Sequence, residues 1–296
     1  MRFQKRIIRI VMLTVCGALA TLASAQMQPP PVSVKPLTGG VYWTQGGAGG
    51  NTGLIVGKDG VIVIDAKTTP ESAKEMLDDL AKLTPKPVTH VILTHSDRDH
   101  VNGLSAFPNK GLTIISQTNA KKEIEESLNG PDAAPLDYFP TKTVDKEESL
   151  TIDGVRLQLL HFAPAHTSGD LIVYLPEQKI VFTGDLIVSL NPFPLIHLEK
   201  HGSSAGWIES AKGMLALDAD TYVSGHGDLQ TKDDIQKRLN RVQDRYNKIK
   251  ELVAQGKSLE EVKIALNDTK APTPLPGAPR FPTFTETTYK ELGGAN

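Results

Sequence analysis

The chain has 296 residues, of which 39% are hydrophobic and 22% are charged, and its formal net charge at pH 7 is −2. This is the composition of a globular protein with a sizeable core, and it excludes a disordered chain, a collagen-like chain and a membrane protein with many spans.

Residues 1–25 have the pattern of an export signal. Four basic residues come first, and an almost unbroken apolar run from Ile10 to Ala23 follows. Ala23-Ser24-Ala25 has the small residues of a cleavage site, so we expect a mature chain that begins near Gln26 and is secreted or periplasmic. The alternative is an uncleaved anchor, which is disfavoured because the apolar run is short for a membrane span.

Cleavage of this segment would change both the charge and the available chemistry. The mature chain would keep 28 basic and 34 acidic residues, and Cys16, the one cysteine, would be lost. No disulfide, thiol nucleophile or thiolate ligand is then expected. The acidic balance gives no general attraction to nucleic acid. We therefore expect a small-molecule substrate, no nucleic acid and no membrane contact after cleavage, and the oligomeric state is left open.

The remaining chain alternates strand and helix patterns. Residues 26–37 are predicted to form an extended leader, because three consecutive prolines preclude a helix. Strands are predicted at 41–44, 53–56, 61–65, 88–93, 112–116, 157–161, 171–175 and 180–183. Helices are predicted at 70–83, 119–127, 205–217 and 231–255, with a short one after Ser258, from apolar spacing and capping residues.

These elements predict an α+β domain over residues 38–270, with hairpins and helices around a mixed sheet. The tail, residues 271–296, is rich in Pro and Gly, and we expect it to wrap the surface or to be mobile.

The most informative segment is His95-Ser96-Asp97-Arg98-Asp99-His100, directly after the predicted strand at 88–93. Ligands commonly bind at the carboxyl ends of such strands. In an extended segment His95, Asp97 and Asp99 alternate and can converge on one side, whereas His100 must turn away. One mononuclear site that uses all four is awkward, and two adjacent metals would solve the geometry.

Three more candidate ligands follow apolar strand patterns downstream. His166 lies in Pro-Ala-His-Thr-Ser-Gly-Asp, Asp185 ends Phe-Thr-Gly-Asp, and His226 lies in Ser-Gly-His-Gly. Each has a glycine or another small residue beside it, which lets the backbone approach a crowded site.

In this order, the motifs resemble the signature of the metallo-β-lactamase superfamily: His-x-His-x-Asp-His, then a His, an Asp in Thr-Gly-Asp, and a His in Gly-His-Gly. The resemblance covers residues 38–255. It implies an αββα sandwich of two mixed β-sheets with helices outside and metals in a groove at one edge. It also implies a binuclear hydrolase in which a metal-bound hydroxide attacks an ester, lactone, amide or related substrate, and the signal at residues 1–25 makes this an exported one.

The resemblance also implies a ligand set. His95 and His166 would bind a first metal, and Asp185 would bridge it to a second. The second metal would be bound by Asp99, His100 and His226, and Asp99 would also act as the catalytic residue that orients the nucleophile. The ions would be two divalent metals, zinc by default for such ligands, although manganese and iron are used in the superfamily.

Asp97 departs from the signature, which has a histidine at its position. Asp97 can bind the metal directly, as a carboxylate does in a diiron branch, or act through water, or mark a weak first site in a protein that works with one metal. As a ligand it would make the centre less positive, so we expect a higher pH optimum or a harder metal such as manganese or iron.

Three alternatives to a general hydrolase stay open. The first is a β-lactamase of the cysteine-free type, although Asp185 in Thr-Gly-Asp looks more like the thioesterase, lactonase and nuclease branches. The second is a diiron redox protein, suggested by Asp97 alone, but the residues after 255 are too few for the flavin domain of those relatives. The third is a non-catalytic metal-binding module, which is disfavoured because structural zinc sites are usually rich in cysteine.

The other histidines are interpreted as packing or surface residues. His90 and His161 lie on predicted core strands and are expected to pack there. His197 and His201 follow Asp185 in a predicted loop at the rim of the groove, where either could touch substrate, but we expect both to be surface histidines.

Overall fold

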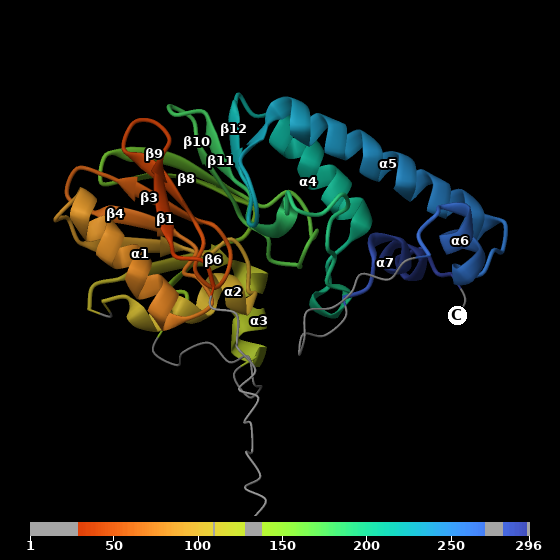
Figure 1. Cartoon of the computed structure of the whole chain (residues 1–296), viewed down its shortest axis with the longest axis horizontal. Coiled ribbons are helices and arrows are strands. Elements are labelled where there is room, and N and C mark those ends of the chain that lie inside the picture. The colour runs from red at the N-terminus through yellow and green to blue at the C-terminus, as the bar shows by residue number, and fades with distance from the viewer. Residues whose placement is uncertain (1–28, 109, 128–137, 270–280, 295–296) are drawn as a thin grey trace, which may run out of the picture.

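The computed structural model describes residues 29–108, 110–127, 138–269 and 281–294 (Figure 1). The predicted export signal at residues 1–25 lies outside the described residues, as does the start of the tail. Within the described part, no helix combines the length and the apolar character needed to cross a membrane.

Two mixed β-sheets form the centre of the molecule. The first has the strand order β1-β2-β3-β4-β5-β6-β7, antiparallel up to β4 and parallel from there. The second has the order β13-β12-β11-β10-β9-β8, in which only β11 and β12 are parallel neighbours. The strands are β1 (Ser33–Pro36), β2 (Val41–Gln45), β3 (Thr52–Val56), β4 (Val61–Ile64), β5 (Val88–Ile92), β6 (Thr113–Gln117), β7 (Lys142–Val144), β8 (Glu147–Ile152), β9 (Val155–Leu160), β10 (Ile172–Leu175), β11 (Ile180–Phe182), β12 (Thr221–Val223) and β13 (Gln230–Thr231).

The sheets pack face to face, and helices cover their outer faces (Figure 1). Strand β4 is covered on both faces. Ile62 and Ile64 face the second sheet, while Val61 and Val63 face α1 (Pro70–Leu83). Side chains alternate along a strand, so a strand that is covered on both faces is apolar at every position. The αββα prediction is thereby confirmed.

The longer helices form where their capping residues predict them. Thr69 caps α1, Ser203 caps α4 (Ser204–Ala216), and Thr231 forms a capping box with Asp234 at the start of α5 (Lys232–Ala254). These caps satisfy backbone N–H groups that have no partner within the helix. The shorter helices are α2 (Arg98–Val101), α3 (Thr118–Glu126) and α6 (Leu259–Ala265), with 3₁₀ turns η1 (Asn102–Ala106), η3 (Gly184–Leu186) and η4 (Leu198–Lys200).

The two ends of the domain differ from the prediction. The predicted leader contains β1, which pairs with β2. The tail contains a further helix, α7 (Phe284–Glu291), whose Phe284 and Tyr289 are buried. Glu291 accepts hydrogen bonds from the Ser203 hydroxyl and the Ser204 backbone, so α7 is fixed to the start of α4. Strands β7, β8, β12 and β13 are also absent from the prediction, because they are short or carry polar residues on an exposed face.

Candidate metal centre

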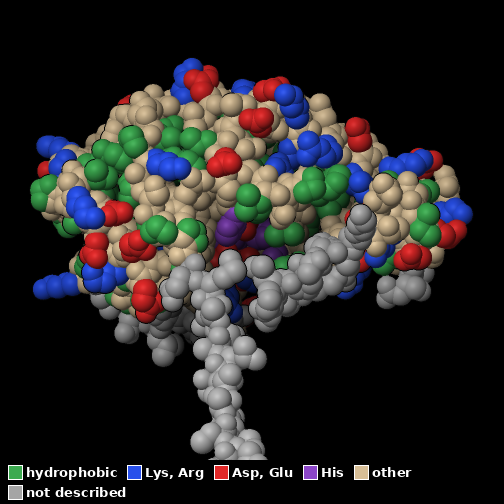
Figure 2. All heavy atoms as spheres, viewed as in Figure 1, with side chains coloured by type: hydrophobic (Ala, Val, Ile, Leu, Met, Phe, Trp, Pro, Cys, Tyr) green, Lys and Arg blue, Asp and Glu red, His purple; other side chains and the backbone are tan. Residues whose placement is uncertain are grey.

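All seven predicted ligands lie at one edge of the sandwich, on segments that follow β5, β11 and β12 or connect β9 to β10. Their ligand atoms form three groups in which every atom lies within 4.8 Å of the others. The groups are His95–Asp97–His166, His95–His100–Asp185 and Asp99–His100–His226. The histidines lie in a hollow of the surface (Figure 2), which contains a cavity of about 260 Å³.

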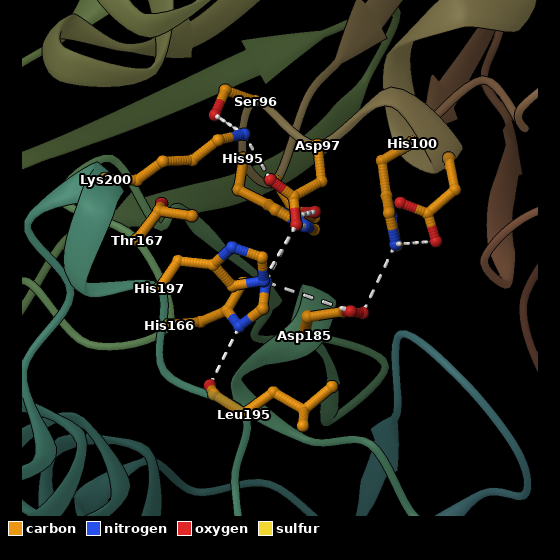
Figure 3. A network of polar contacts seen from close by, with 12 residues as sticks. His95, Ser96, Asp97, His100, His166, Thr167, Asp185, Leu195, His197 and Lys200 are labelled. Atoms are coloured by element: carbon orange, nitrogen blue, oxygen red, sulfur yellow. Dashed lines mark hydrogen bonds and ion pairs between the residues drawn. The ribbon is translucent and has the colours of Figure 1, made fainter. Parts of the chain in front are cut away.

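One half of the centre is built around Asp97 (Figure 3). Asp97 Oδ2 lies 3.1 Å from His166 Nε2 and 3.7 Å from His95 Nε2. His166 Nδ1 lies 2.9 Å from the Leu195 carbonyl oxygen, which orients its ring. The structure therefore brings Asp97 together with the two histidines of the predicted first site.

The other half contains Asp99, His100 and His226. Asp97 is the N-cap of α2, so the chain turns there, and the His100 ring lies beside the His95 ring, with centroids 4.3 Å apart, and also reaches His226 after β12. His226 Nε2 lies 3.0 Å from Asp99 Oδ2 and 3.3 Å from His100 Nε2. The short helix α2 therefore lets all four motif residues reach the centre, which an extended segment would not allow.

Asp185 lies between the two halves. Its Oδ1 is 3.2 Å from His100 Nε2, and its Oδ2 is 3.5 Å from His226 Nε2 and 3.9 Å from His166 Nε2. A Cβ atom at Gly225 would lie 2.0 Å from Asp185 Oδ1. A side chain at that position would displace the carboxylate, so the glycine is required by close packing.

The ionisable groups of the two halves stabilise one another's charges. Burial alone would raise the pKa of Asp97, but hydrogen bonds to His166 and His95 hold it well below its usual value. Burial would lower the pKa of His166, and Asp97 nevertheless raises it to about 10. The pKa of His100 is likewise raised well above its usual value, because Asp185 and Asp65 outweigh burial.

The donor set fits divalent metal ions. His95 Nε2 is buried and has no hydrogen-bond partner among the residues that the structure describes. It faces the same carboxylates as the other imidazoles, and buried nitrogen atoms normally have partners. Imidazole and carboxylate ligands without sulfur suit zinc, iron and manganese.

Asp65 is a functional residue that the sequence analysis missed. Its carboxylate accepts hydrogen bonds from the Thr94 backbone at 2.8 Å and from the Thr94 hydroxyl at 2.7 Å, and it lies 2.7 Å from His100 Nδ1. A carboxylate in this position fixes the tautomer and the ring orientation of a metal-binding histidine. The available signal was an aspartate directly after the apolar strand β4.

The prediction for His197 is wrong. It is 8% exposed, and its Nε2 lies 3.6 Å from Asp97 Oδ2. Its backbone N–H donates to the His166 carbonyl, which draws the loop inward. His201, in the same loop, is exposed as predicted, while His90 and His161 are half-buried on or beside their strands and belong to none of the three ligand groups.

Lys200 supplies a positive charge beside Asp97 that the motif gives no sign of. Its ammonium group contacts Asp97 Oδ1 and lies 3.1 Å from the Ser96 hydroxyl (Figure 3). This cation offsets the additional carboxylate. The expected shift in pH optimum or metal preference stays a prediction, and its charge count now includes Lys200.

One wall of the cavity is apolar. It consists of Val188, Leu190, Leu195 and Phe281, of which Leu190 is 73% exposed and Phe281 is 44% exposed. Among the described residues, neither lysine nor arginine lines the cavity. The cavity therefore combines metal-binding groups with a hydrophobic surface.

The chain belongs to the metallo-beta-lactamase superfamily, whose family model matches residues 46–226. It is 28% identical over 200 residues to the alpha subunit of a 2,4-dinitroanisole O-demethylase from a Nocardioides strain, and 23% identical over 217 residues to a linear primary-alkylsulfatase from a Pseudomonas strain. These matches cover 67% and 59% of this chain, and 58% and 40% of the relatives. The chain therefore spans roughly half the length of those two proteins.

Solved structures show the same fold. A metallo-beta-lactamase from Pontibacter korlensis superposes with a TM-score of 0.62 at 20% identity, over 72% of this chain and 99% of that one. Similarity at this level establishes the αββα architecture and leaves the reaction to be inferred from the site.

Proposed function

We propose that the protein is an exported, binuclear metal-dependent hydrolase that cleaves an ester, lactone, amide or related bond in a small molecule. The observation that carries this proposal is the pair of His/Asp groups that share Asp185 between them. Superfamily relatives are hydrolases, which supports the class of reaction.

In this proposal His95, Asp97 and His166 would hold a first divalent ion, Asp99, His100 and His226 would hold a second, and Asp185 would serve both. The ions are most simply two zinc ions, given the nitrogen and oxygen ligands. When bound, they supply an activated water and a Lewis acid that stabilises the developing oxyanion.

Asp99 is the proposed catalytic residue. Its Oδ2 faces His226 at 3.0 Å, and its side chain remains 31% exposed at the cavity. In this role the carboxylate would orient the nucleophile and accept its proton. Burial would raise the pKa of Asp99, but the charges of His100 and His226 lower it, so the carboxylate is ionised and able to accept a hydrogen bond.

The apolar wall favours a substrate with an uncharged hydrophobic group beside the scissile bond. A β-lactam antibiotic carries a carboxylate, and the described cavity lining offers no lysine or arginine to bind it. A cysteine-free β-lactamase is therefore the second candidate, supported by the similarity to metallo-beta-lactamases. The open cavity argues against a closed, purely structural metal site.

The test is turnover of a panel of chromogenic esters, lactones, phosphoesters, sulfate esters and cephalosporins by the zinc-loaded protein, with Asp99→Asn as the comparison. We expect hydrolysis of esters or lactones that rises with the size of the apolar group and falls at least tenfold in the variant. Turnover of cephalosporins alone would favour the second candidate. Absence of bound metal and of turnover across the panel would overturn the proposal.

Export is tested separately. Expression of the full chain in a bacterium, followed by mass spectrometry of the periplasmic fraction, should give a mature N-terminus at Gln26. An intact N-terminus in the membrane fraction would contradict cleavage.

A further inference from the structure

The proposed histidine ligands share a pattern of support in which Nδ1 is fixed and Nε2 faces the centre. Nδ1 of His95 lies 3.0 Å from the Thr94 hydroxyl, and Nδ1 of His100 lies 2.7 Å from Asp65. Nδ1 of His166 lies 2.9 Å from a backbone carbonyl. Such contacts set the tautomer so that the Nε2 lone pair is available to a metal.

His197 has the same pattern. Its Nδ1 lies 2.7 Å from Glu199 Oε1, and its Nε2 points to Asp97 Oδ2 at 3.6 Å (Figure 3). Its ring packs edge-on against the His166 ring, with centroids 4.6 Å apart. A surface histidine in a loop would have neither the burial nor the oriented partner.

The backbone holds His197 in this position. Its N–H donates to the His166 carbonyl at 2.8 Å, and Ser168 N–H donates to the Lys200 carbonyl at 2.8 Å. The η4 turn is therefore tied at two points to the segment that carries His166. The side chain is held on a fixed element, which is what a metal ligand requires.

We propose that His197 is a fifth protein ligand of the first metal, beside His95, Asp97, His166 and the shared Asp185, although it belongs to none of the three compact ligand groups. This inference rests on the proposed metal-dependent function. In the superfamily signature the first site has three histidines, and this chain has an aspartate in place of one of them. His197 restores the third imidazole from a different loop, while Lys200 engages Asp97 Oδ1 and leaves Oδ2 for the metal.

The experiment compares metal binding by the full mature chain and by His197→Ala. Zinc content is measured by elemental analysis, and the two affinities by competition with a chromophoric chelator. The Co²⁺-substituted proteins are compared by visible absorption. The matched control is His201→Asn, which changes an exposed histidine of the same loop and suits its left-handed backbone (φ 55°).

We expect His197→Ala to weaken one of the two sites by more than about 100-fold, which is the upper end for residues that only hydrogen-bond a ligand. The other site and the control should be unchanged, and the Co²⁺ spectrum should change only in His197→Ala. Removal of the Glu199 contact by Glu199→Ala should weaken the same site by about tenfold or more.

Two unaltered zinc affinities and an unaltered Co²⁺ spectrum in His197→Ala would overturn the inference and leave the proposed function intact; His197 would then contact substrate instead, seen as a change in KM. A wild-type protein that binds neither ion would overturn the proposed function and the inference together. If circular dichroism shows that His197→Ala does not fold, His197→Gln and Glu199→Ala decide between the same outcomes.

Discussion

The two halves of the centre share Asp185 but are supported in different ways. Asp99, His100 and His226 follow the superfamily signature, and Asp65 supports His100 from the adjacent strand β4. The half around Asp97 departs from the signature, and its supporting residues, His197 and Lys200, come from the η4 turn. A change within the motif is thus accompanied by a cation and an imidazole from a loop about 100 positions away.

This difference shows which features a short motif determines by itself. The sheets fix where β4, β5 and β12 end, so residues at those ends meet whatever the loops contain. The η4 turn is held by backbone hydrogen bonds to the segment around His166, and its side chains can vary without disturbing the sheets. Substitutions in the η4 turn can therefore change the charge and the number of ligands of the metal centre without changing the sheets.

The largest expected effect is that of Asp185→Asn, because Asp185 is common to both halves. The substitution keeps the shape and removes a buried negative charge that lies within 4 Å of three imidazoles. We expect both metal affinities to fall and kcat/KM to drop by more than about 100-fold, since a residue that only supports a ligand already contributes 10- to 100-fold. Elemental analysis and initial rates measure both quantities.

His226→Ala is the comparison for Asp185→Asn, since His226 belongs to one half alone. It should weaken the site of Asp99 and His100 and spare the site of His166. A protein in which Asp185→Asn removes only one of two metals would show that Asp185 does not serve both halves.

The next largest effect that we expect is a pH dependence of the stability that metal ions add to the fold. In the metal-free protein the pKa of His166 is about 10, above its usual 6.5, so its stabilising contribution is complete below pH 6.5 and is lost as the pH rises to about 10. Metal ions bind the neutral imidazole, so they stabilise the fold more as the pH rises. The gap in Tm between metal-loaded and metal-free protein should widen between pH 6.5 and 9.5.

The widening of the Tm gap should correspond to a few kcal/mol of unfolding free energy. Each kcal/mol shifts Tm by about 2–4 °C in a domain of this size. The lowered pKa of buried Lys67, about 8, makes stability rise with pH above 8, but it does so in both forms and cancels in the gap. In Asp97→Ala, the part of the widening that is due to His166 should be lost, because Asp97 raises the pKa of His166. The part that is due to His100 should remain, because Asp185 and Asp65 raise the pKa of His100. A gap that is constant with pH would contradict this account.

Much of the fold and of the centre could be predicted from the sequence, for identifiable reasons. Strands such as β4 are apolar on both faces, and α5 begins at a capping box, so local signals and tertiary packing agree. Among the seven predicted ligands, those of the motif lie beside a buried strand and the others follow strand patterns. Two of the residues that were missed, His197 and Lys200, lie in a loop whose inward position depends on backbone hydrogen bonds to a distant segment.

The Asp97–Lys200 pair should show a coupling of about 1–3 kcal/mol in a double-mutant cycle. Asp97→His alone places an imidazole beside the lysine ammonium, and Lys200→Met alone leaves Asp97 without its cation. The double variant restores the histidine of the superfamily signature and removes the cation that would face it. We expect each single variant to lower the zinc affinity of the first site by about tenfold and the double variant to recover most of it.

Additive losses in that cycle would show that Lys200 does not compensate for Asp97. The affinity of the site formed by Asp99, His100 and His226 serves as the internal control in all three variants, because the backbone hydrogen bond from His100 to Asp97 is kept and neither changed side chain pairs with those three residues.

The smallest effect is expected for Glu123→Gln, which tests whether the half around Asp97 has its own support. Glu123, on α3, accepts hydrogen bonds from the Ser96 hydroxyl at 2.5 Å and the Ser168 hydroxyl at 2.7 Å. Gln keeps one acceptor and removes the charge, so the free energy of unfolding should fall by about 1 kcal/mol and Tm by about 2–4 °C.

The matched control for this change is Glu125→Gln, on the exposed face of the same helix, where the pair with Lys121 is long at 4.0 Å and contributes little. We expect the first-site zinc affinity of Glu123→Gln to fall less than tenfold, and the second-site affinity and the control to stay unchanged. Equal losses at both sites would mean that the two halves are supported as one unit. Loss at the first site alone would mean that α3, η4 and the segment around His166 form a separate support, which is the condition for one half to vary while the other keeps the signature.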